Sequence, residues 1–351
     1  MTATTITRRQ ALALTGAALA TPAVVPGPAR AQELVLRLHQ FLPLNSSIPE
    51  QGIGAWIEAV QTASGGRIRV DHFPSMQLGG SPPSLYDQAR DGVVDIVWTL
   101  LGYTPGRFPR SEAFELPFLN ASAEATSRAF HRFATDRAAD EFAEIHPILF
   151  HTHGRGLLHS KGAPITRLED MRGRKFRGPT RIVTGMLERL GATAVGMPVP
   201  AVPEALSKGV IDGVAIPWEV TMPLRIPELV DSHTEFSGDR GLYAATFVLA
   251  MNRDAFRFMD GELRDVIDAH SGVEWAGRFG RVMDTVDQEG RALAIAAGNP
   301  VLVLDEAETA RWREASAGVA EDWAAEMTAR GLDGPALAQA AHDMVAEEIA
   351  R

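Results

Sequence analysis

Strand-like and helix-like apolar patterns alternate along this chain. Leu34, Leu36 and Leu38 repeat at every second position, which predicts a strand, and a helical face of period 3.6 follows over 53–60. A second strand, a second helix and the nearly continuous apolar run 93–101 come next. Such a run is typical of a strand buried on both faces. The order predicts parallel strands in a sheet covered by helices.

The alternation restarts near residue 154, which predicts a second α/β unit. Its expected strands cover 157–160, 175–177, 194–197 and 212–216. Helical patterns at 183–190 and 202–208 separate some of these strands. A chain of 351 residues also exceeds the size at which one hydrophobic core stops growing. We therefore predict two α/β lobes.

The chain is expected to cross between the lobes more than once. An apolar strand at 243–251 is placed to return to the first lobe, and 262–297 forms one long helical pattern that spans both. We expect lobe I to hold 32–153 plus about 246–283 and lobe II to hold 154–245 plus about 284–351. Two lobes joined in this way enclose a cleft that can bind a small ligand and close by hinge motion.

Residues 1–31 have the pattern of an export signal peptide. Arg8 and Arg9 form a positive segment, 11–25 is apolar, and 29–31 is an Ala-Arg-Ala cleavage site. The apolar run is shorter than the ~20 residues needed to span a bilayer. The arginine pair suits the twin-arginine route, with an ordinary Sec signal as the alternative. We expect a periplasmic protein, working without a supply of ATP or NAD.

The composition excludes several other function classes. Cysteine is absent, which removes disulfides, Fe–S clusters and thiol nucleophiles. The formal charge of −10 argues against binding to nucleic acid or anionic lipid. His151, His153 and His159 are the best candidates for metal ligands. The sequence has no cysteine or carboxylate residue near them at the spacing that metal ligands usually have. We predict no metal ion and no other cofactor.

Arg177 is the candidate for binding an anion. It lies in a basic segment, 167–181, and the short strand 175–177 ends there at a glycine and a proline. The carboxyl end of a strand in an α/β sheet faces the ligand crevice. A guanidinium there can hold a carboxylate with two parallel hydrogen bonds. The alternative is one more solvated charge in a basic turn.

Residues 216–219 form a second cluster at a strand end. Ile216, Pro217 and Trp218 offer apolar and aromatic surface there. The alternative for Trp218 is a role as core filler.

A set of segments in fixed order resembles the solute-binding proteins of TRAP transporters (tripartite ATP-independent periplasmic transporters), the DctP-type family. The matching segments are 65–70 (GGRIRV), 73–80 (FPSMQLGG), 91–96 (DGVVDI), 114–118 (FELPF), 168–177 (LEDMRGRKFR), 190–192 (LGA) and 205–213 (ALSKGVIDG). No single segment is specific, whereas the ordered set is.

The resemblance implies a two-lobed periplasmic binding protein, type II-like, with mixed sheets. It would close on an organic acid anion and deliver it to a permease with a small and a large membrane subunit. It would act as a monomer, without catalysis. Arg177 would pair with the ligand carboxylate and Arg155 would assist. Further contacts would come from Phe41, Trp98, Thr99, Tyr103, Ile216, Pro217, Trp218, Thr246 and Phe247.

The apolar run 214–218 narrows the expected ligand. Some members of the family, such as those that bind sialic acid, have polar residues here. A polyhydroxylated sugar acid would leave hydroxyls unpaired against this surface, at roughly 1–3 kcal/mol each. Together with Trp98 and Tyr103, the run favours a monocarboxylate with an apolar or aromatic body.

Two competing hypotheses stay open. The first is an exported lyase or hydrolase acting on a carboxylated substrate, with His39 or Glu219 as the base. The second is a binding protein of the ABC type.

Overall fold

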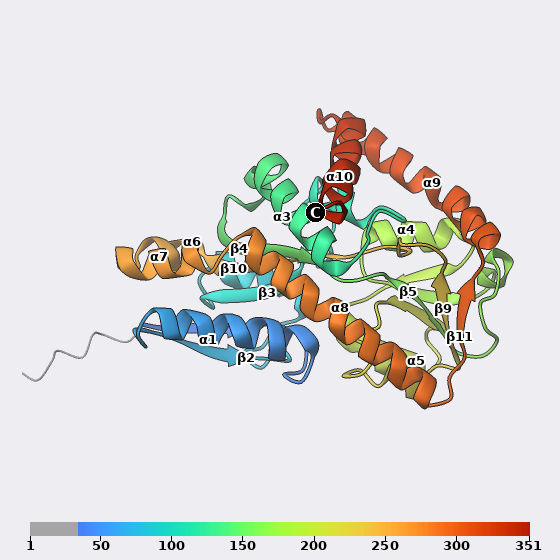
Figure 1. The fold of residues 1–351 in the computed structure, drawn as a ribbon, viewed down its shortest axis with the longest axis horizontal. Helices are drawn as coiled ribbons and strands as arrows, with labels where there is room; N and C mark the ends of the chain where they lie inside the picture. Colours follow the sequence, from blue (N-terminus) through green and yellow to red (C-terminus); the bar gives the residue numbers. More distant parts are fainter. Residues whose placement is uncertain (1–33) are drawn as a thin grey trace, which may run out of the picture. The chain divides into compact units, whose positions relative to one another are not determined.

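The computed structural model describes residues 34–351 and arranges their strands in two sheets (Figure 1). The predicted signal peptide lies outside the described residues. Two mixed sheets flanked by helices confirm the predicted two-lobed α/β fold. Residues 34–351 form one compact unit, so the predicted lobe boundaries stay a prediction.

The first sheet has the strand order β2-β1-β3-β10-β4. β1 (Leu34–His39) runs parallel to β2 (Ile68–Phe73) and β3 (Ile96–Leu100). β10 (Thr246–Asn252) runs antiparallel to β3 and to β4 (Ile145–Thr152). Every residue of β3 and β10 is buried, as their unbroken apolar runs predict for central strands. The strand near 243–251 therefore does return to the first lobe.

The second sheet has the strand order β11-β9-β5-β8-β6-β7. Its strands are β5 (Leu157–Ser160), β6 (Lys175–Gly178), β7 (Thr193–Gly196), β8 (Gly213–Ile216), β9 (Ser232–Phe236) and β11 (Val301–Leu304). β6 runs parallel to β7 and β8, whereas β5 runs antiparallel to β8 and β9. The sequence patterns gave no sign of β9 or β11. β9 has the polar sequence SHTEF, and β11 is an edge strand of four residues.

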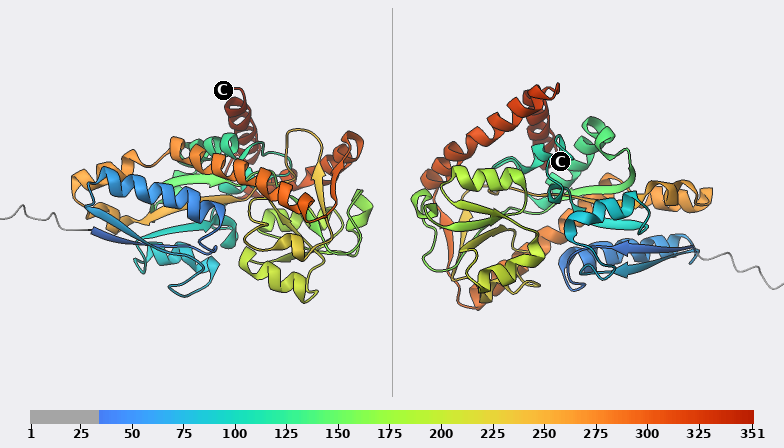
Figure 2. Two further views of the ribbon diagram at one scale, coloured as in Figure 1. Left: turned by 60° about the horizontal axis from the view of Figure 1, so that its bottom comes forward. Right: turned by 180° about the vertical axis from the view of Figure 1, so that it is seen from behind.

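Helices pack around both sheets (Figure 2). They are α1 (Gly54–Ala63), α2 (Leu85–Arg90), α3 (Ala123–Arg137), α4 (Arg181–Arg189), α5 (Val202–Ser207), α6 (Arg253–Arg257), α7 (Gly261–Ala269), α8 (Val273–Ala296), α9 (Glu306–Ala329) and α10 (Gly334–Ile349). Short 3₁₀ or π turns cover Ile48–Ile53, Pro82–Ser84, Leu101–Tyr103, Ser111–Glu115, Ala139–Phe142, Leu168–Met171, Val199–Ala201 and Ile226–Glu228. α9 packs on α4, and α10 returns to pack on α3. Among residues 34–351, no helix has both the length and the apolar character needed to cross a membrane.

The long helical pattern at 262–297 is interrupted, contrary to the sequence prediction. Gly272 has a φ of 92°, which an α-helix cannot accommodate, so α7 ends before it and α8 begins after it. α8 nevertheless reaches both lobes (Figure 1). Its first half packs on α3 and β4. Further along, Asp287 accepts a hydrogen bond of 2.7 Å from the Glu219 backbone N–H beyond β8.

Close packing of α8 on α3 depends on Gly280. A Cβ at this position would lie 2.4 Å from the Ala123 carbonyl oxygen, which is backbone and cannot move aside cheaply. Gly185 in the middle of α4 is the matched control, since a Cβ there meets nothing within 4 Å.

We expect Gly280→Ala to lower the free energy of unfolding by roughly 1–3 kcal/mol through overpacking. Gly185→Ala should raise it by roughly 0.5–1 kcal/mol, because alanine loses less backbone entropy in a helix. Urea denaturation of the two variants measures both changes. Equal effects of the two substitutions would contradict the packing argument.

Candidate functional site

A cavity lies where the carboxyl ends of the parallel strands of both sheets meet. The free space in it is about 30 Å³, far less than the roughly 300–1,000 Å³ of typical small-molecule sites, so its walls lie close together in this structure. The predicted lobe I supplies Phe41, Leu42, Trp98, Leu100, Tyr103, His153 and Phe247, and the segment that leads into β10 supplies Tyr243 and Ala245. The second lobe supplies Arg177, Pro179, Val199, Ile216, Pro217, Glu219 and Val220. Strand ends from the two sheets therefore form opposite walls of one site.

Arg177 is a buried cation on this wall, and only 1% of its surface is exposed. Its Nε donates to the Met197 carbonyl at 2.9 Å and its Nη1 to the Ala215 carbonyl at 3.2 Å. Nη2 has no hydrogen-bond partner, and no ion pair within residues 34–351 includes Arg177, whose nearest polar side-chain neighbour is Tyr103. Burial lowers the pKa of Arg177, yet arginine stays charged in proteins. The site therefore presents a fixed positive charge with an unused donor.

Aromatic rings stack beside the guanidinium. The Trp98 ring lies between Phe41, at a centroid distance of 4.9 Å and 11°, and Phe247, at 5.1 Å and 2°. Tyr103 meets Phe41 edge to face at 5.5 Å. Strand pairing fixes this stack, since β3 and β10 are neighbours in the first sheet. The result is a largely apolar wall built from nearly parallel rings.

The histidines near the cavity are neutral. His151 accepts from Trp98 Nε1 at 2.8 Å, and burial lowers its pKa to about 3. His153 Nε2 accepts from the Ala245 backbone N–H at 3.0 Å, and its Nδ1 donates to the Gly154 carbonyl at 2.7 Å. Burial lowers the pKa of His153 to about 4. With their Nε2 lone pairs already used, these rings offer no metal site, and residues 34–351 contain no group of three metal-ligating side chains.

Two hydrogen bonds join the lobes across the cavity. The Tyr103 hydroxyl accepts from the Val199 backbone N–H at 2.9 Å. The Ser47 hydroxyl, beyond β1, donates to Glu219 Oε2, beyond β8. Each bond pairs one residue from the first lobe with one from the second. The structure is therefore closed over the cavity.

Glu219 is a buried carboxyl on the cavity wall, and only 4% of its surface is exposed. Burial raises the pKa of Glu219 to about 7, and the Ser47 hydrogen bond offsets part of that rise. Asp287 lies behind it on α8, and its pKa is raised well above the usual range by burial and by the Glu219 charge. Ionising these two neighbouring carboxyls is therefore unfavourable in the folded protein.

The structure brings together seven of the eleven residues predicted for the site: Arg177, Ile216, Pro217, Trp98, Tyr103, Phe41 and Phe247. It leaves Thr99 and Thr246 outside the cavity lining. The Thr246 hydroxyl donates to Glu115 Oε1 at 2.9 Å, away from the cavity.

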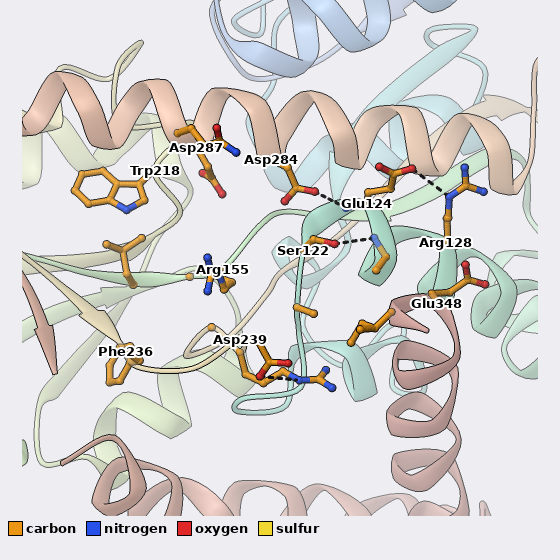
Figure 3. Close-up of a pocket in the computed structure, with 18 of the residues that line it drawn as sticks. Ser122, Glu124, Arg128, Arg155, Trp218, Phe236, Asp239, Asp284, Asp287 and Glu348 are labelled. Carbon is orange, nitrogen blue, oxygen red and sulfur yellow. Dashed lines mark hydrogen bonds and ion pairs between the residues drawn. The ribbon is translucent and has the colours of Figure 1, made fainter. Parts of the chain in front are cut away.

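Arg155 and Trp218 line a different and larger pocket (Figure 3). Arg155 is exposed, and its Nη1 donates to the Gly238 carbonyl at 3.2 Å. Trp218 donates to Glu235 at 2.8 Å and packs against the histidines His159 and His233. The structure therefore separates both residues from the cavity that holds Arg177.

Some cavity residues were not predicted for the site, among them Tyr243, Ala245, His153, Val199 and Glu219. The alternation of a strand could have revealed two of them. Residues 243, 245 and 247 share one face of an extended segment and all line the cavity, whereas Thr246 lies on the other face.

The raised pKa of Glu219 has a consequence for stability. The folded protein holds this proton up to about pH 7, whereas an unfolded glutamate releases it near its ordinary pKa of 4.5. Stability is therefore lost as pH rises from about 4.5 to 7, by an amount on the order of 3 kcal/mol. Asp287 adds to the same trend, because the Glu219 charge also raises its pKa.

We expect Glu219→Gln to stabilise the ligand-free protein near pH 8 and to have little effect near pH 5, where Glu219 is already neutral. Thermal unfolding at both pH values measures this difference. Glu188→Gln, an exposed position on α4, is the control and should change neither value. A Glu219→Gln variant that is equally stabilised at both pH values would contradict the assignment.

Comparison with known proteins agrees with this geometry. The family described as "Bacterial extracellular solute-binding protein, family 7" (DctP) matches residues 43–326. The TsaT protein of Comamonas testosteroni, described as an outer membrane transporter protein, is 23% identical over 89% of this chain and 92% of its own.

Two solved structures are more similar. A marine metagenome TRAP solute-binding protein, described as specific for aromatic acid ligands, is 44% identical with a TM-score of 0.89, over 90% of this chain and 99% of that one. A TRAP solute-binding protein from Rhodoferax ferrireducens, crystallised with copurified benzoate, is 45% identical with a TM-score of 0.88, over 90% and 98%. Our chain therefore belongs to the DctP family, the extracellular solute-binding proteins of TRAP transporters.

Proposed function

We propose that this protein captures an aromatic monocarboxylate in the periplasm, as a monomer, and delivers it to the small and large membrane subunits of a TRAP permease. The observation that carries the proposal is the buried guanidinium of Arg177, whose Nη2 has no partner. A buried cation without an anion is costly. A ligand carboxylate supplies the missing charge and the missing acceptor together.

The charges on the cavity wall favour one carboxylate over two. Of the described residues that line the cavity, Arg177 is the only cation. A second carboxylate would enter the same buried space without a partner and would face Glu219. Burying an unpaired charge is strongly unfavourable. Dicarboxylates therefore fit this site poorly.

The rest of the wall favours an aromatic body. The stacked rings of Phe41, Trp98 and Phe247 line the cavity with apolar surface, and aromatic ligands prefer offset-stacked or edge-to-face contacts with such rings. A sugar acid would bring several hydroxyls to this surface without enough partners.

The similar structures support the same ligand class. Besides the two described above, the marine protein was crystallised with 3-hydroxybenzoate, and a Bordetella bronchiseptica protein 28% identical to this chain binds both enantiomers of mandelate. Each of these ligands is an aromatic ring that carries one carboxylate.

Catalysis on the captured acid is not part of the proposal. His39 has both ring nitrogens engaged, with Gln88 at 2.7 Å and the Leu78 backbone N–H at 3.3 Å, and it does not line the cavity. His153 also uses both nitrogens. Glu219 alone could act as a base, so recovery of the ligand unchanged after incubation is the appropriate check. Formation of a product would favour the enzyme hypothesis.

We expect Arg177→Ala to weaken benzoate binding by roughly 100- to 3,000-fold, because breaking a buried charge pair costs about 3–5 kcal/mol. Arg177→Lys should recover only part, since an ammonium cannot make two parallel hydrogen bonds. Arg155→Ala is the matched control and should change affinity less than threefold, because Arg155 is exposed outside the cavity. Titration calorimetry measures all three, and a loss below threefold for Arg177→Ala would remove Arg177 from the site.

Ligand binding should also favour the closed arrangement, because the ligand contacts walls from both lobes. We expect benzoate to reduce the radius of gyration of the wild-type protein in small-angle X-ray scattering. Arg177→Ala at the same benzoate concentration should show no such compaction. An unchanged radius for the saturated wild-type protein would contradict ligand-driven closure.

A further inference from the structure

The Glu219 carboxyl lines the cavity, but binding of a ligand carboxylate at Arg177 does not involve it. Its Oε2 accepts from Ser47, and its backbone N–H donates to Asp287 at 2.7 Å. No hydrogen bond within residues 34–351 involves Oε1, and this oxygen is not among the fully buried side-chain atoms that lack a partner. Because Glu219 lines the cavity, this oxygen is an acceptor available to a ligand.

The Glu219 acceptor is separate from the Arg177 donor. No ion pair joins the two side chains within the described chain, and Arg177 is held instead by the backbone carbonyls of Met197 and Ala215. A carboxylate bound at Arg177 therefore leaves Glu219 without a compensating partner. An ionised Glu219 can accept a hydrogen bond from a donor group of the ligand.

The other polar side chains that line the cavity are less suited to accept a hydrogen bond from the ligand. His153 already uses both ring nitrogens, and the Tyr103 hydroxyl already accepts from Val199. The Tyr243 hydroxyl can donate to a ligand carboxylate as well as accept. Glu219 is the one carboxyl on the described wall, and a hydrogen bond to a charged acceptor is about twice as strong as a neutral one.

We propose that Glu219 accepts a hydrogen bond from a hydroxyl on the ligand ring, so that the site prefers hydroxylated aromatic monocarboxylates to unsubstituted ones. The inference rests on the proposed function, since it takes Arg177 as the carboxylate partner. Ser47 acts as a positioning residue. It comes from the opposite lobe, so its hydrogen bond orients the Glu219 carboxylate only when the lobes are closed.

Titration calorimetry near pH 8 with benzoate and the three hydroxybenzoate isomers tests the proposal. We expect the wild-type protein to bind at least one isomer about 10-fold or more tightly than benzoate, because a hydrogen bond to a charged group carries that much binding energy. Glu219→Gln keeps an acceptor for Ser47 and removes the charge. It should reduce the preference to within about threefold while leaving benzoate binding equal or tighter.

Glu115→Gln is the matched control. Glu115 is also a buried carboxyl, but it lies outside the cavity and accepts from Thr246. This variant should keep the wild-type preference.

A second readout needs no variant. The preference of the wild-type protein should be smaller near pH 6 than near pH 8, because a protonated Glu219 is a weaker acceptor. Burial and the Ser47 hydrogen bond set the pKa of Glu219, and the Glu219 charge in turn raises the pKa of its neighbours Asp287 and Tyr243. Ring hydroxyls and benzoic carboxyls do not titrate in this interval.

The outcomes separate the two proposals. Benzoate bound as tightly as every hydroxybenzoate, or a preference that survives Glu219→Gln, would overturn the role of Glu219 and leave the carboxylate site intact. If the wild-type protein bound none of these acids, or if Arg177→Ala kept its affinity, the proposed function itself would fail.

Discussion

The buried, unpaired guanidinium of Arg177 is the constraint on which the site depends. It lies at the carboxyl end of β6, where carbonyls of Met197 and Ala215 hold two of its nitrogens. Carbonyl dipoles fix the orientation of the guanidinium without neutralising its charge. The folded protein therefore carries an electrostatic cost that an anion relieves on entering. Under the proposed function, relief of this cost is what gives the site its affinity for a carboxylate.

Under the proposed function, closure of the lobes depends on the ligand that the Arg177 charge attracts. Tyr103 with Val199 and Ser47 with Glu219 are single hydrogen bonds across the cavity, each contributing about 1 kcal/mol. The ion pair between Arg181 and Glu112 also joins the two predicted lobes. α8 reaches both lobes and supplies a permanent connection, so opening does not separate them. A ligand that contacts both walls therefore decides between open and closed states.

Local sequence patterns predicted most strands of both sheets, because a strand buried in a sheet has its own apolar signature. β9, with the sequence SHTEF, is polar and is held in place by β5 and β11 rather than by its composition. Within the site, period-two alternation explains why Thr99 and Thr246 lie outside the cavity lining. Both follow or precede a lining residue by one position, so their side chains point to the opposite face of the sheet. Arg155, suggested by the family resemblance alone, lies outside the cavity.

Glu219 shows what local patterns could not provide. The sequence marks it as an acid beyond an apolar strand and as a candidate base of an enzyme, but the same position suits a solvated turn. Its chemistry depends on Ser47, which is 172 residues away in the chain, and on Asp287 from α8. Burial by these distant segments raises the pKa of the carboxyl and leaves one oxygen facing the cavity. One cation and one acceptor at separate places on an aromatic wall define an axis. If both proposed roles hold, a ligand matches that axis with an anion at one end and a hydrogen-bond donor at the other.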